Sequence, residues 1–429
     1  MLATANSSVL TVEHNPARFN LAQSLFLISV VLAPLELKLA GSFTVYDVLV
    51  MGIGLLLMST EAKELKFPPF EFMAAVYVFL LFALLSAFRA TFPLESLTQV
   101  LQFTFIFFIQ IPVILTVVRS QSMLRWSLLS LLVGSLIMTG WAMYFQEEGF
   151  HHRMRTFASE NSNRLGYPTS YLSPFLLCFL IDGWRRRHFL MIVFTLCALY
   201  TLLWGLTASG SRSATVGTLA ALMIFFTFRH GLQINLALLM RAFFTIAMLV
   251  IISYLFYSSD FFPGILRERI DKTLMFQSSL VNDRTRLAIA GWRGFMQSPW
   301  LGVGFDNFRH VATQFNVPMV SNQTPHNIWL QFLAQIGIFG TLAFMFMIGF
   351  WFLRLLQCQR MIVDPSQRTI LWALIASMCA IMTIFMFIPI MIHRHYWLIY
   401  GLGLAAVFSV KNIQLIAVPN SSEPSKPDD

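Results

Sequence analysis

The sequence predicts an all-α polytopic membrane protein with about twelve transmembrane helices. Of the 429 residues, 57% are hydrophobic and only 11% are charged, whereas soluble domains carry about 25% charged residues. Apolar runs of about 20 residues recur along the chain, and each is long enough to cross roughly 30 Å of hydrocarbon as a helix. Alternating segments of roughly 10 residues, which mark an outer-membrane barrel, are not evident.

The predicted spans follow one another along the chain and define one transmembrane domain, residues 21–411. A polar segment, residues 1–20, precedes it and lacks a cleavage-site pattern, so no signal peptide is expected. A polar tail, residues 412–429, follows it and is expected to be disordered. A long polar loop, about residues 258–325, separates the ninth span from the tenth. The spans are residues 21–38, 43–59, 69–88, 99–118, 126–145, 166–182, 189–207, 212–228, 241–257, 326–353, 369–391 and 396–411.

Basic residues are distributed unevenly between the two sides of the predicted bundle. The short loops and termini on one side hold 15 lysines and arginines, and the short loops on the other side hold 7. Because cytoplasmic loops are enriched in these residues, both termini are predicted to be cytoplasmic and the long loop to be periplasmic. The long loop contains no cysteine, so no disulfide framework is expected there.

Arginine dominates the outer side of the predicted bundle. Of its 14 basic residues, only Lys38 and Lys272 are lysines. The planar guanidinium matches phosphate oxygens, whereas the lysine ammonium is a strongly hydrated point charge. Arg212 would begin the eighth span, where an arginine is costly unless it is paired or solvated. Arg155 lies in the second-longest outer loop. For any single arginine, binding to lipid head groups is the alternative.

Residues 324–327, Thr-Pro-His-Asn, predict a helix start, with Thr324 as N-cap and Pro325 at the first helical position. His326 would then lie in the first turn, where the helix dipole favours the neutral imidazole that a general base requires. Gly337 and Gly340 would share its helical face and allow close helix packing, which would turn that face into the bundle. The alternative is a capping histidine at the membrane interface.

Arg284 and Arg286 lie two residues apart in the long loop. They would share one face of an extended segment or diverge on a helix, and either could bind a phosphate. Structural salt bridges are the alternative for both, with Asp271, Asp283 or Asp306 as the partner. Beyond them, Pro299, Gly302 and Gly304 predict a tight turn that returns the chain toward the membrane.

Several classes of site find no support in the sequence. His393 and His395 suggest a metal, but no outer Cys, Asp and Glu cluster completes a site, so neither a metal nor another cofactor is expected. Paired carboxylates, a phosphate-binding glycine loop and a Ser-His-Asp order are not apparent. The net charge of +9 largely reflects the positive-inside bias, and no nucleic-acid partner is expected. A base and several arginines at the outer face suit a substrate with a lipid tail, a pyrophosphate and a hydroxyl acceptor.

The order of these motifs resembles the O-antigen ligase and polymerase superfamily. His326-Asn327, nine residues and then Gly337-Ile338-Phe339-Gly340 resembles its HN-x9-G-x2-G signature. Arg284, fifteen residues before the Pro299 of SPWLGVGFDNF, resembles the arginine ahead of its P-L-x-G-x-G-x-N-F block. SGSRSA around Arg212 and RTFASENSN from Arg155 are similar to its remaining motifs. The chain departs from the family at Ala288 and Gly291, where many members carry Trp and Ala.

The resemblance implies a metal-independent inverting glycosyltransferase in the bacterial inner membrane, with its active site at the periplasmic face. The donor would be a glycan linked to undecaprenyl pyrophosphate. His326 would deprotonate the acceptor hydroxyl, and Arg284 would act with it at the reacting centre. The pyrophosphate would be bound by Arg284, Arg286, Arg212 and Arg155, while Asn327, Gly337 and Gly340 would have structural, orienting roles.

The acceptor distinguishes the members of this superfamily. A ligase joins the glycan to lipid A-core, and a polymerase joins it to a growing glycan. The single dominant outer loop favours the ligase, with the polymerase as the alternative. A transporter of anions or of the lipid-linked sugar is a third possibility, but transporters tend to show internal repeats and polar or broken helices near the membrane midplane. A purely structural membrane subunit is the fourth.

Overall fold

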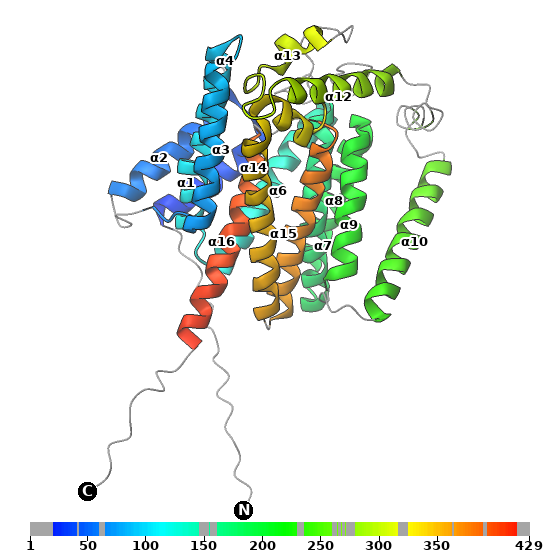
Figure 1. The fold of residues 1–429 in the computed structure, drawn as a ribbon. Coiled ribbons are helices and arrows are strands. Elements are labelled where there is room, and N and C mark those ends of the chain that lie inside the picture. Colours follow the sequence, from blue (N-terminus) through cyan, green and yellow to red (C-terminus); the bar gives the residue numbers. More distant parts are fainter. Residues whose placement is uncertain are drawn as a thin grey trace, which may run out of the picture.

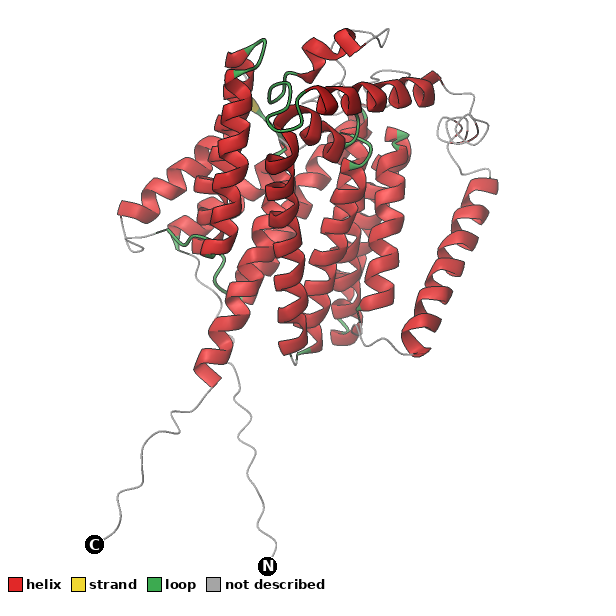
Figure 2. Ribbon diagram, in the orientation of Figure 1, coloured by secondary structure: helices red, strands yellow, loops and turns green. Residues whose placement is uncertain are grey.

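The structure is a computed structural model that describes residues 20–40, 43–59, 65–145, 154, 161–229, 236–259, 264, 267, 271, 279–315, 325–362, 364–388 and 393–417. Long helices run roughly side by side, and one helix, α12, lies across one end of them (Figure 1). Figure 2 shows that nearly all of the described chain is helical, in agreement with the predicted all-α class.

The N-terminal part consists of helices α1 (Leu21–Leu32), α2 (Val45–Ser59), α3 (Phe70–Phe88), α4 (Pro93–Phe105), α5 (Ile111–Val117) and α6 (Gln121–Phe145). A 3-10 turn, η1 (Ala33–Leu35), extends α1, and a π-helical turn, η2 (Ile106–Gln110), joins α4 to α5. Pro112 follows this widened turn, which accommodates a residue that has no N–H to donate. Strands β1 (Lys38–Ala40) and β2 (Phe43–Thr44) form an antiparallel pair that the sequence did not predict.

The C-terminal part begins with four helices, α7 (Asn163–Arg186), α8 (Phe189–Ser209), α9 (Arg212–Phe228) and α10 (Leu236–Ser258). It continues with α12 (Ser279–Gln297), α13 (Phe308–Val311), η4 (Ala312–Phe315), α14 (Ile328–Met361), α15 (Pro365–Phe385) and α16 (Arg394–Ala417). Every predicted span therefore overlaps a helix, although the first was predicted to residue 38 and its helical part ends at Leu35. Seven described helices are long and apolar enough to cross a membrane, and three shorter ones are also apolar. These helices indicate a multi-pass membrane protein, while the total of twelve spans stays a prediction.

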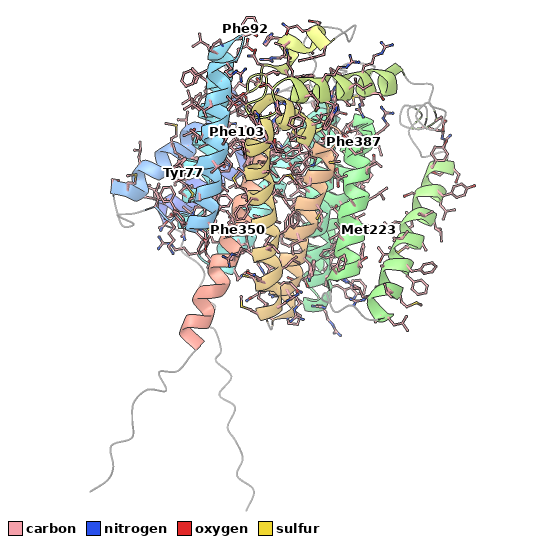
Figure 3. All side chains as sticks on the ribbon, in the orientation of Figure 1. Tyr77, Phe92, Phe103, Met223, Phe350 and Phe387 are labelled. Carbon is pink, nitrogen blue, oxygen red and sulfur yellow. The ribbon has the colours of Figure 1, made fainter. Side chains whose placement is uncertain are left out.

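The bundle is held together by apolar and small residues. Helix α7 packs on α8, α9 and α15, α9 packs on α15, and α14 packs on α3. Glycines permit close approach: a Cβ on Gly217 of α9 would stand 3.2 Å from the carbonyl oxygen of Ala380 in α15. Aromatic rings fill the interior, where Phe79 packs edge-on against Phe103 at a centroid distance of 5.3 Å. Figure 3 shows Phe103 within the mass of side chains between the helices.

The segment predicted as a long polar loop contains a helix that was not predicted from the sequence. Helix α12 spans Ser279–Gln297 and contacts α14 and η4. Its buried residues are Leu287, Ala290, Gly291 and Gly294, and this spacing forms one apolar stripe on a helix. The helix lies across the end of the bundle (Figure 1), so its position fixes where its arginines point.

The predicted turn at Pro299, Gly302 and Gly304 packs against an interruption in helix α14. Gly337 has φ 71° and ψ −171°, which interrupts the helical hydrogen bonding. The N–H groups of Val303 and Gly304 donate to the carbonyls of Ala334 and Gln335 at 2.8 and 3.3 Å. The N–H of Ile338 donates to the Pro299 carbonyl at 2.9 Å. The turn therefore satisfies the backbone groups that the break exposes.

We expect Gly337→Ala to disrupt this junction. A Cβ at Gly337 would stand 2.2 Å from the carbonyl oxygen of Trp300, and the residue has a left-handed φ of 71°. Backbone strain and overpacking together should lower the free energy of unfolding by about 3 kcal/mol or more. The matched control is Gly349→Ala in the same helix, where a Cβ would meet nothing within 4 Å. Thermal unfolding of both variants in detergent measures the difference, and equal midpoints would contradict the prediction.

Candidate active site

His326 lies immediately before α14 rather than inside it. Helix α14 begins at Ile328, and Asn327 is its N-cap, with its side-chain oxygen accepting from the N–H groups of Trp329 and Leu330 at 3.1 and 3.2 Å. The prediction that His326 occupies the first helical turn is therefore wrong, and Pro325 is not a helical residue. Thr324, the predicted N-cap, lies outside the described residues. Asparagine is among the best capping residues, which explains why the helix starts later.

Gly337 and Gly340 do not share a helical face with His326 as predicted, because His326 precedes the helix and Gly337 interrupts it. His326 has φ 50°, a left-handed conformation that non-glycine residues adopt rarely. Gly340 faces α3, where a Cβ would stand 3.2 Å from the Cβ of Phe82. The two glycines thus seat α14 against α3 and against the turn after α12.

His326 is half-buried, and the two nitrogens of its imidazole differ in their hydrogen bonding. It donates one hydrogen bond to the backbone of Phe387, which lies just beyond α15. Figure 3 labels Phe387 at the end of the bundle that α12 covers. Among the described residues, Nδ1 is buried without a hydrogen-bond partner, so the proton lies on Nε2 and Nδ1 presents a lone pair. Burial, followed by the positive charge of Arg284, lowers the pKa of His326 to about 4. At neutral pH the ring is neutral and can accept a proton at Nδ1.

Arg284 of α12 lies beside His326 and interacts electrostatically with Arg212, the first residue of α9. Burial lowers the pKa of Arg284, and the positive charge of Arg212 lowers it further, although a guanidinium remains charged. Tyr167 of α7 interacts with the same guanidinium. The structure thus brings together Arg284, Arg212 and His326, which the sequence had singled out, and adds Tyr167, which it had not.

The predicted alternative for Arg284, a structural salt bridge, finds no support in the described residues. Asp271 accepts a hydrogen bond from the Tyr257 hydroxyl, and Asp306 pairs with Arg309 at 3.5 Å. The side chain of Asp283 is outside the described set. Two guanidinium groups with mutual repulsion beside a neutral imidazole form a site suited to a bound anion.

The other predicted arginines do not join this group. Arg286 is exposed, and a helical separation of two residues turns it about 200° away from Arg284. Arg155 lies outside the described residues. Helix α12 is held close to the start of α14, because a Cβ on Gly291 would stand only 3.0 Å from Cγ of Leu330 and 3.2 Å from Cγ of Pro325. The glycine that departs from the family pattern therefore lies at the helix contact nearest to His326.

A second polar cluster surrounds Glu36. This cluster was not predicted from the sequence. The Glu36 carboxylate contacts Arg164 and His393, and His395 lies 3.5 Å away. Burial alone would raise the pKa of Glu36, but His393 and Arg164 outweigh burial and lower it. The two histidines therefore flank a carboxylate. Within the described ranges, no group of three His, Cys, Asp or Glu is arranged to hold a metal ion.

The Glu36 cluster is linked to the site through Tyr396 and Tyr167. Tyr396 packs edge-on against His393 at 5.9 Å and lies 6.4 Å from Tyr167, the neighbour of Arg284. Arg394 anchors the start of α16 through an ion pair of 2.7 Å with Asp47. The cluster thereby joins α7, which carries Arg164, to the start of α16, which follows His393.

Comparison with protein-family models matches residues 197–345 to the O-antigen ligase family. The matched stretch includes Arg212, Arg284, His326 and the break at Gly337. This match supports the resemblance of the chain to the O-antigen ligase superfamily. No curated protein matches it. The match over residues 197–345 supports a glycosyltransferase-like enzyme of O-antigen and lipopolysaccharide biosynthesis, with lipid-linked glycans and lipid A-core types as partners in general.

Proposed function

We propose that this protein is an inverting, metal-independent glycosyltransferase that moves a glycan from undecaprenyl pyrophosphate to an acceptor hydroxyl. The observation that carries the proposal is the buried, unpartnered Nδ1 of a neutral His326 beside Arg284 and Arg212. In the reaction, the base would remove the proton of the acceptor hydroxyl. The two cationic side chains would stabilise the negative charge that develops on the leaving pyrophosphate.

In the proposed reaction, Nδ1 of His326 takes the proton of the acceptor hydroxyl as that oxygen attacks the anomeric carbon. The bond between this carbon and the pyrophosphate oxygen breaks on the opposite face, which inverts the configuration. Arg284 and Arg212 bind the pyrophosphate and stabilise the charge that it gains. The products are the new glycoside and undecaprenyl pyrophosphate, and the proton leaves His326 afterwards.

Binding of the donor would raise the pKa of His326 and so make it a stronger base. In the free protein, Arg284 opposes a positive charge on His326. Once the anionic pyrophosphate lies between them, its negative charge favours the imidazolium and raises the pKa of His326. The base is then closer in pKa to the working pH at the moment when the acceptor reacts, which is where proton transfer is most effective.

The proposed location is the inner membrane, with the α12 end of the bundle facing the periplasm and both termini in the cytoplasm. Support comes from the arginines and lysines of the short loops and termini, 15 of which lie on the side opposite the long loop. The proposed acceptor is lipid A-core, as for an O-antigen ligase, because one outer loop dominates. A growing glycan, as for a polymerase, would use the same base and arginines.

Deletion of the protein tests the assignment through the gel profile of envelope polysaccharide. Loss of attachment to lipid A-core with normal glycan chain lengths is expected for a ligase. Products that carry a single repeat would instead identify a polymerase. An unchanged profile would contradict glycan transfer and favour transport.

A further inference from the structure

A cavity of about 770 Å³ lies far from His326, among the ends of α7 and α9 and the starts of α8 and α15. In Figure 1 these ends lie opposite α12. Much of its wall is aliphatic, and three arginines complete it. The apolar residues are Leu180, Ile181, Ile192 and Leu196, and the arginines are Arg185, Arg229 and Arg368.

The three arginines of the cavity wall place positive charges close to one another. Arg229 is half-buried and is repelled by Arg185 and Arg241. Arg368 is half-buried and donates to the carbonyl of Ile362 at 2.7 Å. Repulsion between guanidinium groups is relieved when an anion binds between them.

Two acidic residues lie close to the cavity lining in the chain, Asp182 of α7 and Asp364 just before α15, and both are engaged by other groups. The carboxylate of Asp182 accepts a hydrogen bond from the Ser366 hydroxyl at 3.1 Å and lies 3.7 Å from Arg125. This carboxylate is therefore directed to α6 and to the start of α15. The carboxylate of Asp364 caps α15 by accepting from the N–H of Ser366 at 3.0 Å. In the described part of the chain, three arginines and no acidic residue line the cavity.

We propose that this cavity binds an anionic phospholipid of the leaflet opposite the active site. An acyl chain would lie against the aliphatic wall, and the phosphate would lie between Arg185, Arg229 and Arg368. Apolar walls beneath a cationic rim complement an amphiphile rather than a soluble anion, and basic pockets between transmembrane helices bind lipid head groups. Trp184, which is 74% exposed beside the cavity, is a residue type enriched at the membrane–water interface.

The site is tested with the full-length protein in detergent, by native mass spectrometry during titration with phosphatidylglycerol or with phosphatidylcholine of the same acyl chains. The wild-type protein should bind one phosphatidylglycerol at least about tenfold more tightly than phosphatidylcholine. The variant Arg185→Glu should lose this preference. Its matched control is Arg186→Glu, an exposed neighbour that does not line the cavity, and this variant should keep it. Equal affinity for the two lipids, or equal loss in both variants, would overturn the proposal.

A second variant tests the apolar wall. Leu196 is 49% exposed, so Leu196→Trp should fill part of the cavity without unfolding the protein. It should weaken phosphatidylglycerol binding while all charges remain. If only the charge variant weakens binding, the lipid lies on the surface and the cavity is not its site. If inorganic phosphate displaces the lipid at equal concentration, the site recognises a soluble anion, and the lipid assignment fails.

Discussion

The variant His326→Asn is expected to remain folded and inserted but to transfer glycan about 10²–10⁴-fold more slowly than the wild-type protein. Asparagine tolerates the left-handed backbone that His326 adopts, yet it cannot accept the proton of the acceptor hydroxyl. The lipid-linked donor should therefore accumulate in cells, and the purified variant should form little glycoside. Both quantities can be followed by gel analysis of labelled glycan.

His310 offers a matched control for this substitution. It is also half-buried, but it hydrogen-bonds Glu95 at 2.8 Å, and its ring contacts that of Phe92 in a tilted arrangement with a centroid distance of 4.3 Å. The variant His310→Asn should retain transfer. Normal surface polysaccharide in cells that carry only His326→Asn would contradict a general-base role for His326.

The pH dependence has a defined sign. Because the base must be neutral, kcat/KM for the free enzyme should be constant above the pKa of His326, about 4, and should fall as pH decreases through it. The same residue also affects stability. Its pKa is lowered by folding, so stability is fully present above the ordinary histidine pKa and is lost as pH falls toward 4.

The membrane class and the main site residues could be predicted because they depend on local sequence. The hydropathy of each span is a property of consecutive residues. His326, Arg284 and Arg212 were recognisable by residue type and spacing. Helix α12 was also accessible, since Leu287, Ala290, Gly291 and Gly294 repeat with helical period. The polar composition of the surrounding loop concealed that period.

Other features could not be read from the sequence because their partners are distant in it. The break at Gly337 is stable only because Pro299, Val303 and Gly304 satisfy its backbone. Without knowledge of that contact, the glycine fits a continuous helix equally well. Glu36 meets Arg164 and His393 only after three separate segments pack together. The spacing of residues along the sequence does not predict this contact between distant segments.

The second large effect is expected at Arg284. The variant Arg284→Ala should reduce kcat by about 10²–10³-fold, because the pyrophosphate loses a cation aimed at its developing charge. Arg284→Lys should recover only part of this loss, since a point charge replaces a planar fork of donors. The exposed Arg286 on the same helix supplies the control, and Arg286→Ala should remain close to wild-type activity. Rates of glycoside formation by purified variants measure all three.

Arg284 has two separable effects, and the pH profile distinguishes them. Besides contacting the leaving group, it lowers the pKa of His326, so its removal should shift the acid limb of the profile upward. At a pH well above the shifted pKa, His326 is neutral with or without Arg284. Any defect that persists there measures the role of Arg284 toward the pyrophosphate. Full recovery of activity at that pH would mean that Arg284 acts only by keeping the base unprotonated, and the pyrophosphate would then depend on Arg212.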